Sequence, residues 1–290
     1  MIARLVLLAA LVLWAGAACG SDRGAPVTTV ATVAAPDGVP IAYEARGRGE
    51  PALVFIHCWA CDRSFWRGQI DSLATDHRVI ALDLPGHGAS GRARTEWSIP
   101  GLGADVAALV TALELPRVIL VGHSMGAPVA LAAAARLRGR VAGIVCVDAL
   151  HDVELRVEDR MIAPMLAGFE RDYPATMTAA VRGMFAGSAD TASANWVLEK
   201  ALAADTGVAL ALMRTYPSLD FVALLADASA PVRCINAAPR GPTSLETKTA
   251  SNRKYGDFDA VLMEGVGHYL QLERPGEFNA KLREILATFQ

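Results

Sequence analysis

The segment Gly122-His-Ser-Met-Gly126 has the residue types of a nucleophilic hydrolase. It follows the short apolar run 118–121 and precedes the alanine-rich stretch 127–137, so a strand is expected to turn directly into a helix. A serine at such a turn adopts a strained backbone, which the flanking glycines permit because they have no Cβ. The helix N-terminus favours negative charge that develops beside the serine. Ser124 is therefore predicted to be a nucleophile rather than an idle turn residue.

Alternating strand and helix patterns surround this motif. Strands are predicted over residues 28–33, 39–45, 52–57, 79–83, 118–121, 141–147, 231–237 and 258–263, and the main helices over 99–113, 127–137 and 275–289. The first two strands are joined by the turn signal Pro-Asp-Gly, which is typical of an antiparallel hairpin. From 150 to about 229 the strand pattern stops and four helical patches follow. This order predicts a mostly parallel sheet covered on both faces, with a helical cap inserted between two strands.

These elements carry motifs that together resemble an α/β-hydrolase. The motifs are His57 with Asp62 and Trp66, Asp83-Leu-Pro-Gly-His-Gly88, the segment around Ser124, and Gly265-Val-Gly-His268 with Glu273-Arg-Pro275. The resemblance runs from about residue 27 to residue 290. It implies the α/β class, with an eight-stranded, mostly parallel α/β-hydrolase sheet. The core would consist of residues 28–149 and 230–290, and the helical cap insertion of residues 150–229.

The same resemblance implies a histidine base that follows the serine in the chain. Of the six histidines, His268 lies in a glycine-rich loop after the last predicted strand. An imidazole there could take the proton of Ser124, whose hydroxyl is a weak nucleophile at neutral pH. We assign other roles to the remaining five: His57 to ordering the turn after the third strand, His87 to a structural turn, His123 to the variable position of the serine motif, and His77 and His151 to solvated positions.

The acid that would orient His268 has two candidates. Most relatives carry it after the strand that follows the cap, but residues 237–246 contain no Asp, and Glu246 is the only acid there. Some relatives place the acid one strand earlier, where this chain has Asp148. Both strand ends open on the same edge of the sheet, so we favour Asp148 and keep Glu246 as the alternative; a helix cap is the structural interpretation of Asp148. Asp83 is expected to tie down its own loop.

The resemblance also implies an oxyanion hole built from the backbone N–H groups of Trp59 and Met125. Relatives carry glycine where this chain has Cys58, which either tolerates or distorts the turn. A disulfide between Cys58 and Cys61 would lock that turn in an oxidising compartment. A redox centre at the same pair lacks any thioredoxin-like context and is the weaker interpretation.

The N-terminus has the features of an export signal. Arg4 supplies a positive charge, residues 5–14 are apolar, and small residues follow, which predicts a signal peptide over 1–18 and a linker over 19–27. Residues 17–21 resemble a bacterial lipobox, with Gly16 where leucine is usual. Cys19 is thus the candidate lipidation site, which predicts a cell-envelope lipoprotein held at the membrane by its acyl chains. Cleavage by ordinary signal peptidase, giving a soluble periplasmic or secreted protein, is the alternative.

Composition excludes several classes of function. The chain has 290 residues, a formal net charge of -3 and 53% hydrophobic residues. It therefore offers material for a large core but no basic surface for nucleic acid. No apolar window outside the N-terminus is long enough to span a bilayer. Nothing in the residues implies a metal or an organic cofactor.

The predicted function is a serine hydrolase that cleaves small or medium carboxylic esters through an acyl-enzyme. Lactonase, C–C hydrolase and perhydrolase activities fit the same residues. Serine rather than aspartate at the elbow disfavours the haloalkane dehalogenase and epoxide hydrolase chemistry of relatives. A non-catalytic protein that binds a ligand in the capped cleft is the alternative from another class.

Overall fold

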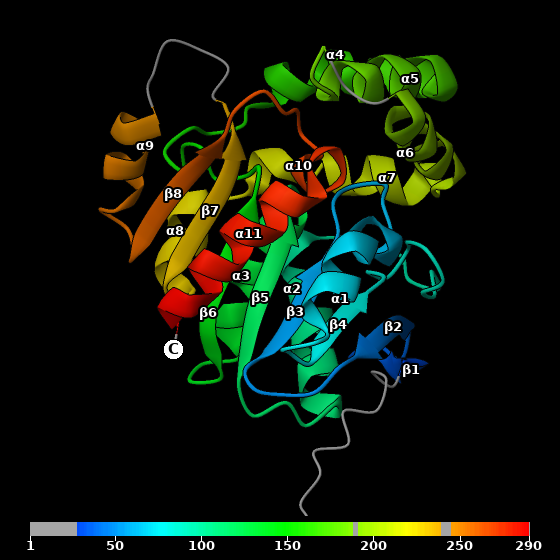
Figure 1. The fold of residues 1–290 in the computed structure, drawn as a ribbon. Coiled ribbons are helices and arrows are strands. Elements are labelled where there is room, and N and C mark those ends of the chain that lie inside the picture. The colour runs from blue at the N-terminus through cyan, green and yellow to red at the C-terminus, as the bar shows by residue number, and fades with distance from the viewer. Residues whose placement is uncertain (1–27, 188–190, 239–244, 290) are drawn as a thin grey trace, which may run out of the picture.

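The fold is built on one eight-stranded sheet (Figure 1). The structure is a computed structural model that describes residues 28–187, 191–238 and 245–289. The strands are β1 (Thr29–Ala34), β2 (Pro40–Arg46), β3 (Ala52–Ile56), β4 (Val79–Leu82), β5 (Val118–His123), β6 (Val141–Val147), β7 (Val232–Ala237) and β8 (Phe258–Met263), in the spatial order β1-β2-β4-β3-β5-β6-β7-β8. β1 pairs antiparallel with β2, and β2 with β4, whereas every other pair is parallel. The predicted fold class is confirmed.

Helices cover both faces of the sheet. On one face, α1 (Arg67–Leu73) and α11 (Pro275–Leu286) bury Ile70, Phe278 and Leu282 against β3 and its neighbours. On the other face lie α2 (Ile99–Ala112), α3 (Gly126–Arg136) and α8 (Phe221–Asp227). β3, β4 and β5 are buried along their whole length, so their continuous apolar runs are what a strand covered on both faces requires.

Four helices between β6 and β7 form a layer over one end of the sheet (Figure 1). They are α4 (Asp159–Arg171), α5 (Tyr173–Met184), α6 (Thr191–Ala203) and α7 (Thr206–Met213). Their buried side chains share a cluster with Cys58, Phe65 and Tyr269 from the core. η2 (Tyr216–Ser218) follows them, and α8, which also lies inside the predicted insertion 150–229, packs into the core cluster of the sheet instead.

The structure contains short elements that were not predicted, and one predicted segment falls outside the described residues. The sequence does not predict α9 (Leu245–Asn252) or α10 (Leu270–Glu273), because neither is long or apolar enough to show a helical period. The short 3-10 helix η1 (Arg63–Trp66) directly precedes α1, and η3 (Ala287–Phe289) directly follows α11. The predicted signal peptide, the linker and Cys19 lie outside the described residues and stay predictions.

Within the described ranges, no single helix is long and apolar enough to cross a membrane. One pair, Thr206–Ser218 with Phe221–Asp227, reaches that length and composition only when taken together, and it is bent by 87°.

The junction between β5 and α3 has the strained turn that its sequence predicts. Ser124 has a φ of 52°, in the left-handed region, where residues other than glycine are uncommon. Its N–H donates to the carbonyl of Val147, 2.9 Å away, which ties the turn to β6. A Cβ on Gly122 would lie 2.2 Å from the carbonyl oxygen of Gly126, and a Cβ on Gly126 would lie 2.4 Å from that of Ile56. Both glycines are therefore required by the close approach of backbone to backbone.

We predict that Gly122→Ala lowers both stability and activity, because the atoms that its Cβ would meet are backbone atoms that cannot rotate away. Gly276→Ala in α11 is the matched control, since a Cβ there meets nothing within 4 Å. It should unfold at the wild-type denaturant concentration or slightly above, because alanine is the better helix former by about 0.5–1 kcal/mol. Urea unfolding of the three proteins is the measurement. Equal midpoints for Gly122→Ala and wild type would show that the turn relaxes at no cost.

Candidate active site

Ser124 stands at the carboxyl end of the sheet, where β5 turns into α3. The serine is partly exposed, whereas the residues on either side of it are buried. The N-terminus of α3 begins two residues later, at Gly126. The positive end of the helix dipole is thus directed at the neighbourhood of the hydroxyl.

His268 and Asp148 are joined by a hydrogen bond. Nδ1 of His268 donates to Oδ2 of Asp148 over 2.6 Å, which leaves Nε2 as the basic nitrogen. Asp148 directly follows β6 with a φ of 44°, and its Oδ1 accepts the N–H of Ala237, 2.9 Å away. Glu246 instead lies exposed in the first turn of α9. Of the two candidate acids, the structure brings Asp148 to the histidine.

Hydrogen bonds set the charge state of Asp148. Burial alone would raise the pKa of its carboxyl group. Donors from His151, His268 and Ala237 outweigh this effect and hold the pKa well below its usual range. Asp148 is therefore a carboxylate at neutral pH, able to stabilise a positive charge on His268.

The loop that carries His268 is held at several points. The N–H of Gly267 donates to the Glu273 carboxylate over 3.0 Å, and the N–H of His268 donates to the carbonyl of Met184 at the end of α5. A Cβ on Gly267 would lie 2.2 Å from that same Met184 oxygen, so only glycine allows the cap to approach this closely. Nε2 of His123 donates to the carbonyl of His268 over 2.8 Å. The position of the base therefore depends on both the core and the cap.

His123 has a structural role that the sequence did not reveal. It is fully buried and receives a hydrogen bond from the Gln271 side chain on Nδ1 while donating to His268 from Nε2. The sequence assigned it only to the variable position of the serine motif. The position of His123, a polar residue at the end of an otherwise apolar buried strand, could have indicated that it has hydrogen-bond partners in the core.

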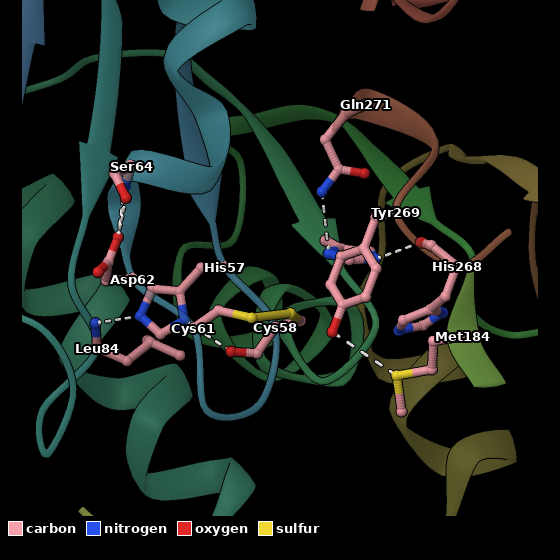
Figure 2. The surroundings of a disulfide bond; sticks show 11 residues. His57, Cys58, Cys61, Asp62, Ser64, Leu84, Met184, His268, Tyr269 and Gln271 are labelled. Atoms are coloured by element: carbon pink, nitrogen blue, oxygen red, sulfur yellow. Dashed lines mark hydrogen bonds between the residues drawn. A yellow bond between two sulfur atoms is a disulfide. The ribbon is translucent and has the colours of Figure 1, made fainter. Parts of the chain in front are cut away.

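The turn after β3 is fixed around Trp59. Nδ1 of His57 donates to the carbonyl of Cys58 over 2.8 Å, while Nε2 accepts the N–H of Leu84 over 2.9 Å. Cys58 and Cys61 are joined by a disulfide (Figure 2). The N–H of Cys61 also donates to the carbonyl of Cys58. The Trp59 indole donates to the carbonyl of Ala209 in α7, which ties the turn to the cap.

The backbone N–H groups of Trp59 and Met125 donate to no group among the described residues. Met125 is nevertheless fully buried. Buried backbone donors are nearly always paired, so the unpaired N–H of Met125, next to the candidate nucleophile, marks a place where an anion could bind. Trp59 is only partly buried, and its part in an oxyanion hole stays a prediction.

Tyr269 packs beside the disulfide (Figure 2). Its hydroxyl faces the Met184 sulfur at 3.6 Å, and its ring stacks on Phe185 with centroids 5.1 Å apart. The ring also lies edge-on to His268, at 5.3 Å between centroids. Tyr269 thus links the turn after β3, the cap and the histidine loop in one packed cluster.

Comparison with known proteins agrees with this geometry. Residues 51–213 match the family model of the alpha/beta hydrolase fold. The chain belongs to the alpha/beta hydrolase fold family. The prediction of an enzyme of this family is thereby confirmed.

Individual relatives match parts of the chain. A dihydrolipoyllysine-residue acetyltransferase component of an acetoin cleaving system from Pseudomonas putida is 39% identical over 35% of this chain and 28% of its own length. A pimeloyl-[acyl-carrier protein] methyl ester esterase from Nitrosomonas europaea is 32% identical over 52% of this chain and 60% of its own length. The chain thus spans less than two thirds of either relative. The solved structure of an esterase from Exiguobacterium antarcticum is similar in fold, with a TM-score of 0.79, 18% identity, and coverage of 89% of this chain and 100% of that one.

Two cavities border the site of this alpha/beta hydrolase. One, of about 360 Å³, is lined by Asp148, His151, Met184, Lys248 and His268 among others. The sequence assigned His151 to a solvated position. In the structure His151 is a loop residue with a side chain 34% exposed, as predicted, but its Nε2 also lies 3.3 Å from Oδ1 of Asp148, a contact that the sequence did not predict.

The larger cavity, of about 530 Å³, lies between the loop after β4 and α6. Its charged groups are paired across it, for example Lys200 with Asp62 at 2.9 Å. Asp83, on its wall, accepts the N–H groups of Arg63 and Ala89 at 2.7 and 2.8 Å. Asp83 thus holds the loop as the sequence predicts. Because Asp148 and His268 line the smaller cavity and neither lines the larger one, we place the chemistry at the smaller one.

No group of three or more His, Cys, Asp or Glu side chains in residues 28–187, 191–238 and 245–289 is arranged to hold a metal ion.

We predict that stability falls as the pH drops from about 6.5 to about 4. Burial lowers the pKa of His57 to about 4 and those of His87 and His123 to about 3, so the folded chain resists protonation that the unfolded chain accepts. Their contribution is fully present above the pKa of a free histidine and is lost toward the folded values. Three such groups give a slope of about 4 kcal/mol per pH unit.

Urea unfolding at pH 7.5, 6.5 and 5.5 measures this slope. His87→Gln removes one of the three groups and should make the slope shallower by about 1.4 kcal/mol per pH unit. Parallel curves for the variant and the wild type would contradict the assignment of a neutral, buried His87.

Proposed function

We propose that this alpha/beta hydrolase is a serine hydrolase that cleaves small or medium carboxylic esters through an acyl-enzyme. The observation that carries the proposal is the 2.6 Å hydrogen bond from His268 Nδ1 to Asp148, on a loop that approaches the strained turn of Ser124. A fixed imidazole with a free Nε2, close to a serine held out of regular structure, is the arrangement that activates a hydroxyl.

In the proposed reaction His268 takes the proton of Ser124 as the hydroxyl oxygen attacks the ester carbonyl. The hydrogen bonds among the described residues do not include one between Ser124 and His268. Such bonds often tighten only when substrate binds, so this geometry is compatible with catalysis. His268 then gives the proton to the leaving alcohol, and water releases the acyl group by the same steps.

The backbone N–H groups of Trp59 and Met125 are proposed to bind the oxyanion. Each donor of this kind contributes about 10²–10³-fold in rate. Cys58 stands where relatives have glycine, and its carbonyl is held by His57 while its sulfur is held by Cys61. These contacts support the interpretation that the turn tolerates Cys58 and keeps the Trp59 donor available.

The size and lining of the site support a small or medium ester. The cavity beside His268, at about 360 Å³, is near the lower end of ligand pockets. The adjoining cap is apolar, with Trp59 edge-on to Phe169 at 5.4 Å between ring centroids. The name of the Nitrosomonas europaea methyl ester esterase above is also in keeping with ester cleavage.

A fluorophosphonate probe tests the nucleophile. We expect the folded protein to be labelled on Ser124, as shown by mapping the adduct to a peptide, and we expect His268→Ala to abolish the label because no base then remains. Ser124→Ala is the blank for hydrolysis of p-nitrophenyl acetate and butyrate. Hydrolysis that persists in Ser124→Ala would place the activity elsewhere, and an unlabelled, folded wild type would favour the non-catalytic binding alternative.

The Ser124→Ala variant also serves as the inactive control in tests of the alternative reactions. A panel of simple lactones, vinylogous 1,5-diketones and peracid formation from acetate with peroxide covers the lactonase, C–C hydrolase and perhydrolase alternatives. The ester prediction holds if kcat/KM for the esters exceeds that for the other classes.

The acid gives a separate prediction. Asp148→Asn should lower kcat by about 10⁴-fold, because an amide there favours the wrong tautomer of His268 and cannot stabilise the imidazolium. Glu246→Gln is the matched control, since its side chain is exposed on α9 and should leave kcat unchanged. Steady-state kinetics on p-nitrophenyl acetate decides between them. The opposite ranking would assign the role to Glu246.

A further inference from the structure

The carboxylate of Asp148 contacts two histidines, one on each oxygen. Oδ2 accepts the bond from Nδ1 of His268 at 2.6 Å, and Oδ1 lies 3.3 Å from Nε2 of His151 and 2.9 Å from the N–H of Ala237. His151 comes three residues after Asp148, before the first helix of the cap. The reaction proposed above uses His268 and leaves His151 without a role.

We propose that His151 is a positioning residue that holds the Asp148 carboxylate in the orientation in which it meets His268. This inference rests on the proposed function for its kinetic readout. It concerns the orientation of the base rather than the identity of the nucleophile.

The positioning role follows from the backbone of Asp148. Its φ of 44° points the side chain away from the regular path of β6, so the carboxylate depends on its partners for orientation. The Ala237 N–H and His151 both contact Oδ1, which fixes the plane in which Oδ2 meets His268. Loss of one of two contacts on Oδ1 should weaken that orientation.

His151 is the more exposed of the two histidines on this carboxylate. Its side chain is 34% exposed, whereas that of His268 is 20% exposed. A substitution at His151 therefore removes the contact on Oδ1 without emptying a position in the core. Asp152, next to His151, accepts the N–H of Glu154 and so is not a substitute partner for His151.

The test is the separate measurement of kcat and KM on p-nitrophenyl acetate for wild type, His151→Gln and His151→Ala. Asp148 acts on His268 and not on the substrate, so loss of its orientation should lower kcat several-fold in His151→Ala and leave KM nearly unchanged. Glutamine keeps an N–H donor, so His151→Gln should retain more of kcat than His151→Ala.

His77→Gln is the matched control. His77 lies in the turn between α1 and β4, at the opposite end of the sheet from His268, and its N–H donates to Leu73. The same substitution there should leave kcat and KM unchanged. Equal kcat values for wild type and His151→Ala, or a loss of kcat in His151→Gln as large as in His151→Ala, overturn the proposal.

A second readout does not need turnover. In a Ser124→Ala background, the NMR signal of the His268 Nδ1 proton reports its hydrogen bond to Asp148. The proposal expects this signal to weaken or move in His151→Ala and to change less in His151→Gln, and identical signals overturn it. If wild type hydrolyses no ester while the change in the signal is present, the proposed function fails and the positioning role of His151 stands.

Discussion

The site depends on one consequence of parallel pairing, which is that β5, β6, β7 and β8 all end at the same edge of the sheet. Ser124 follows β5, Asp148 follows β6 and His268 follows β8, so three distant parts of the chain meet without long connecting loops. The left-handed backbone of Ser124 and Asp148 then directs their side chains out of the strand direction. The sheet therefore provides the proximity, and two strained residues provide the orientation.

Placing polar groups at the end of a buried sheet requires partners for each of them. His57 and His123 are fully buried and neutral, and each uses both ring nitrogens in hydrogen bonds. Neither imidazole is positioned to be the base, because its nitrogens are already occupied by backbone groups or by Gln271. They hold the carbonyls of Cys58 and His268, which belong to the two loops that flank Ser124. The hydrogen bonds of these two histidines thus hold the loops in place although the loops contain polar groups.

The sequence predicted the parts of this architecture that depend on local pattern. The strands were located to within a residue or two because buried parallel strands are continuous apolar runs, and the serine turn because glycines bracket it. His268 and Asp148 followed from the order of motifs in a known family. His123, His151 and the carboxylate of Glu273 could not be assigned in this way, since their roles come from contacts across the sheet edge. The packing of α8 on the core likewise depends on tertiary contacts, which a helical pattern does not encode.

The absence of a carboxylate immediately after β7 has a structural counterpart. Where most relatives would present an acid, this chain presents the N–H of Ala237, which donates to Oδ1 of Asp148. The preceding Asn236 accepts the N–H of Ala149 through its side-chain oxygen, which fixes the segment that follows Asp148. The end of β7 therefore holds the Asp148 carboxylate by a hydrogen bond and does not itself carry an acidic residue. A carboxylate restored beside Ala237 would face Asp148 with a like charge, so the two positions for the acid exclude one another.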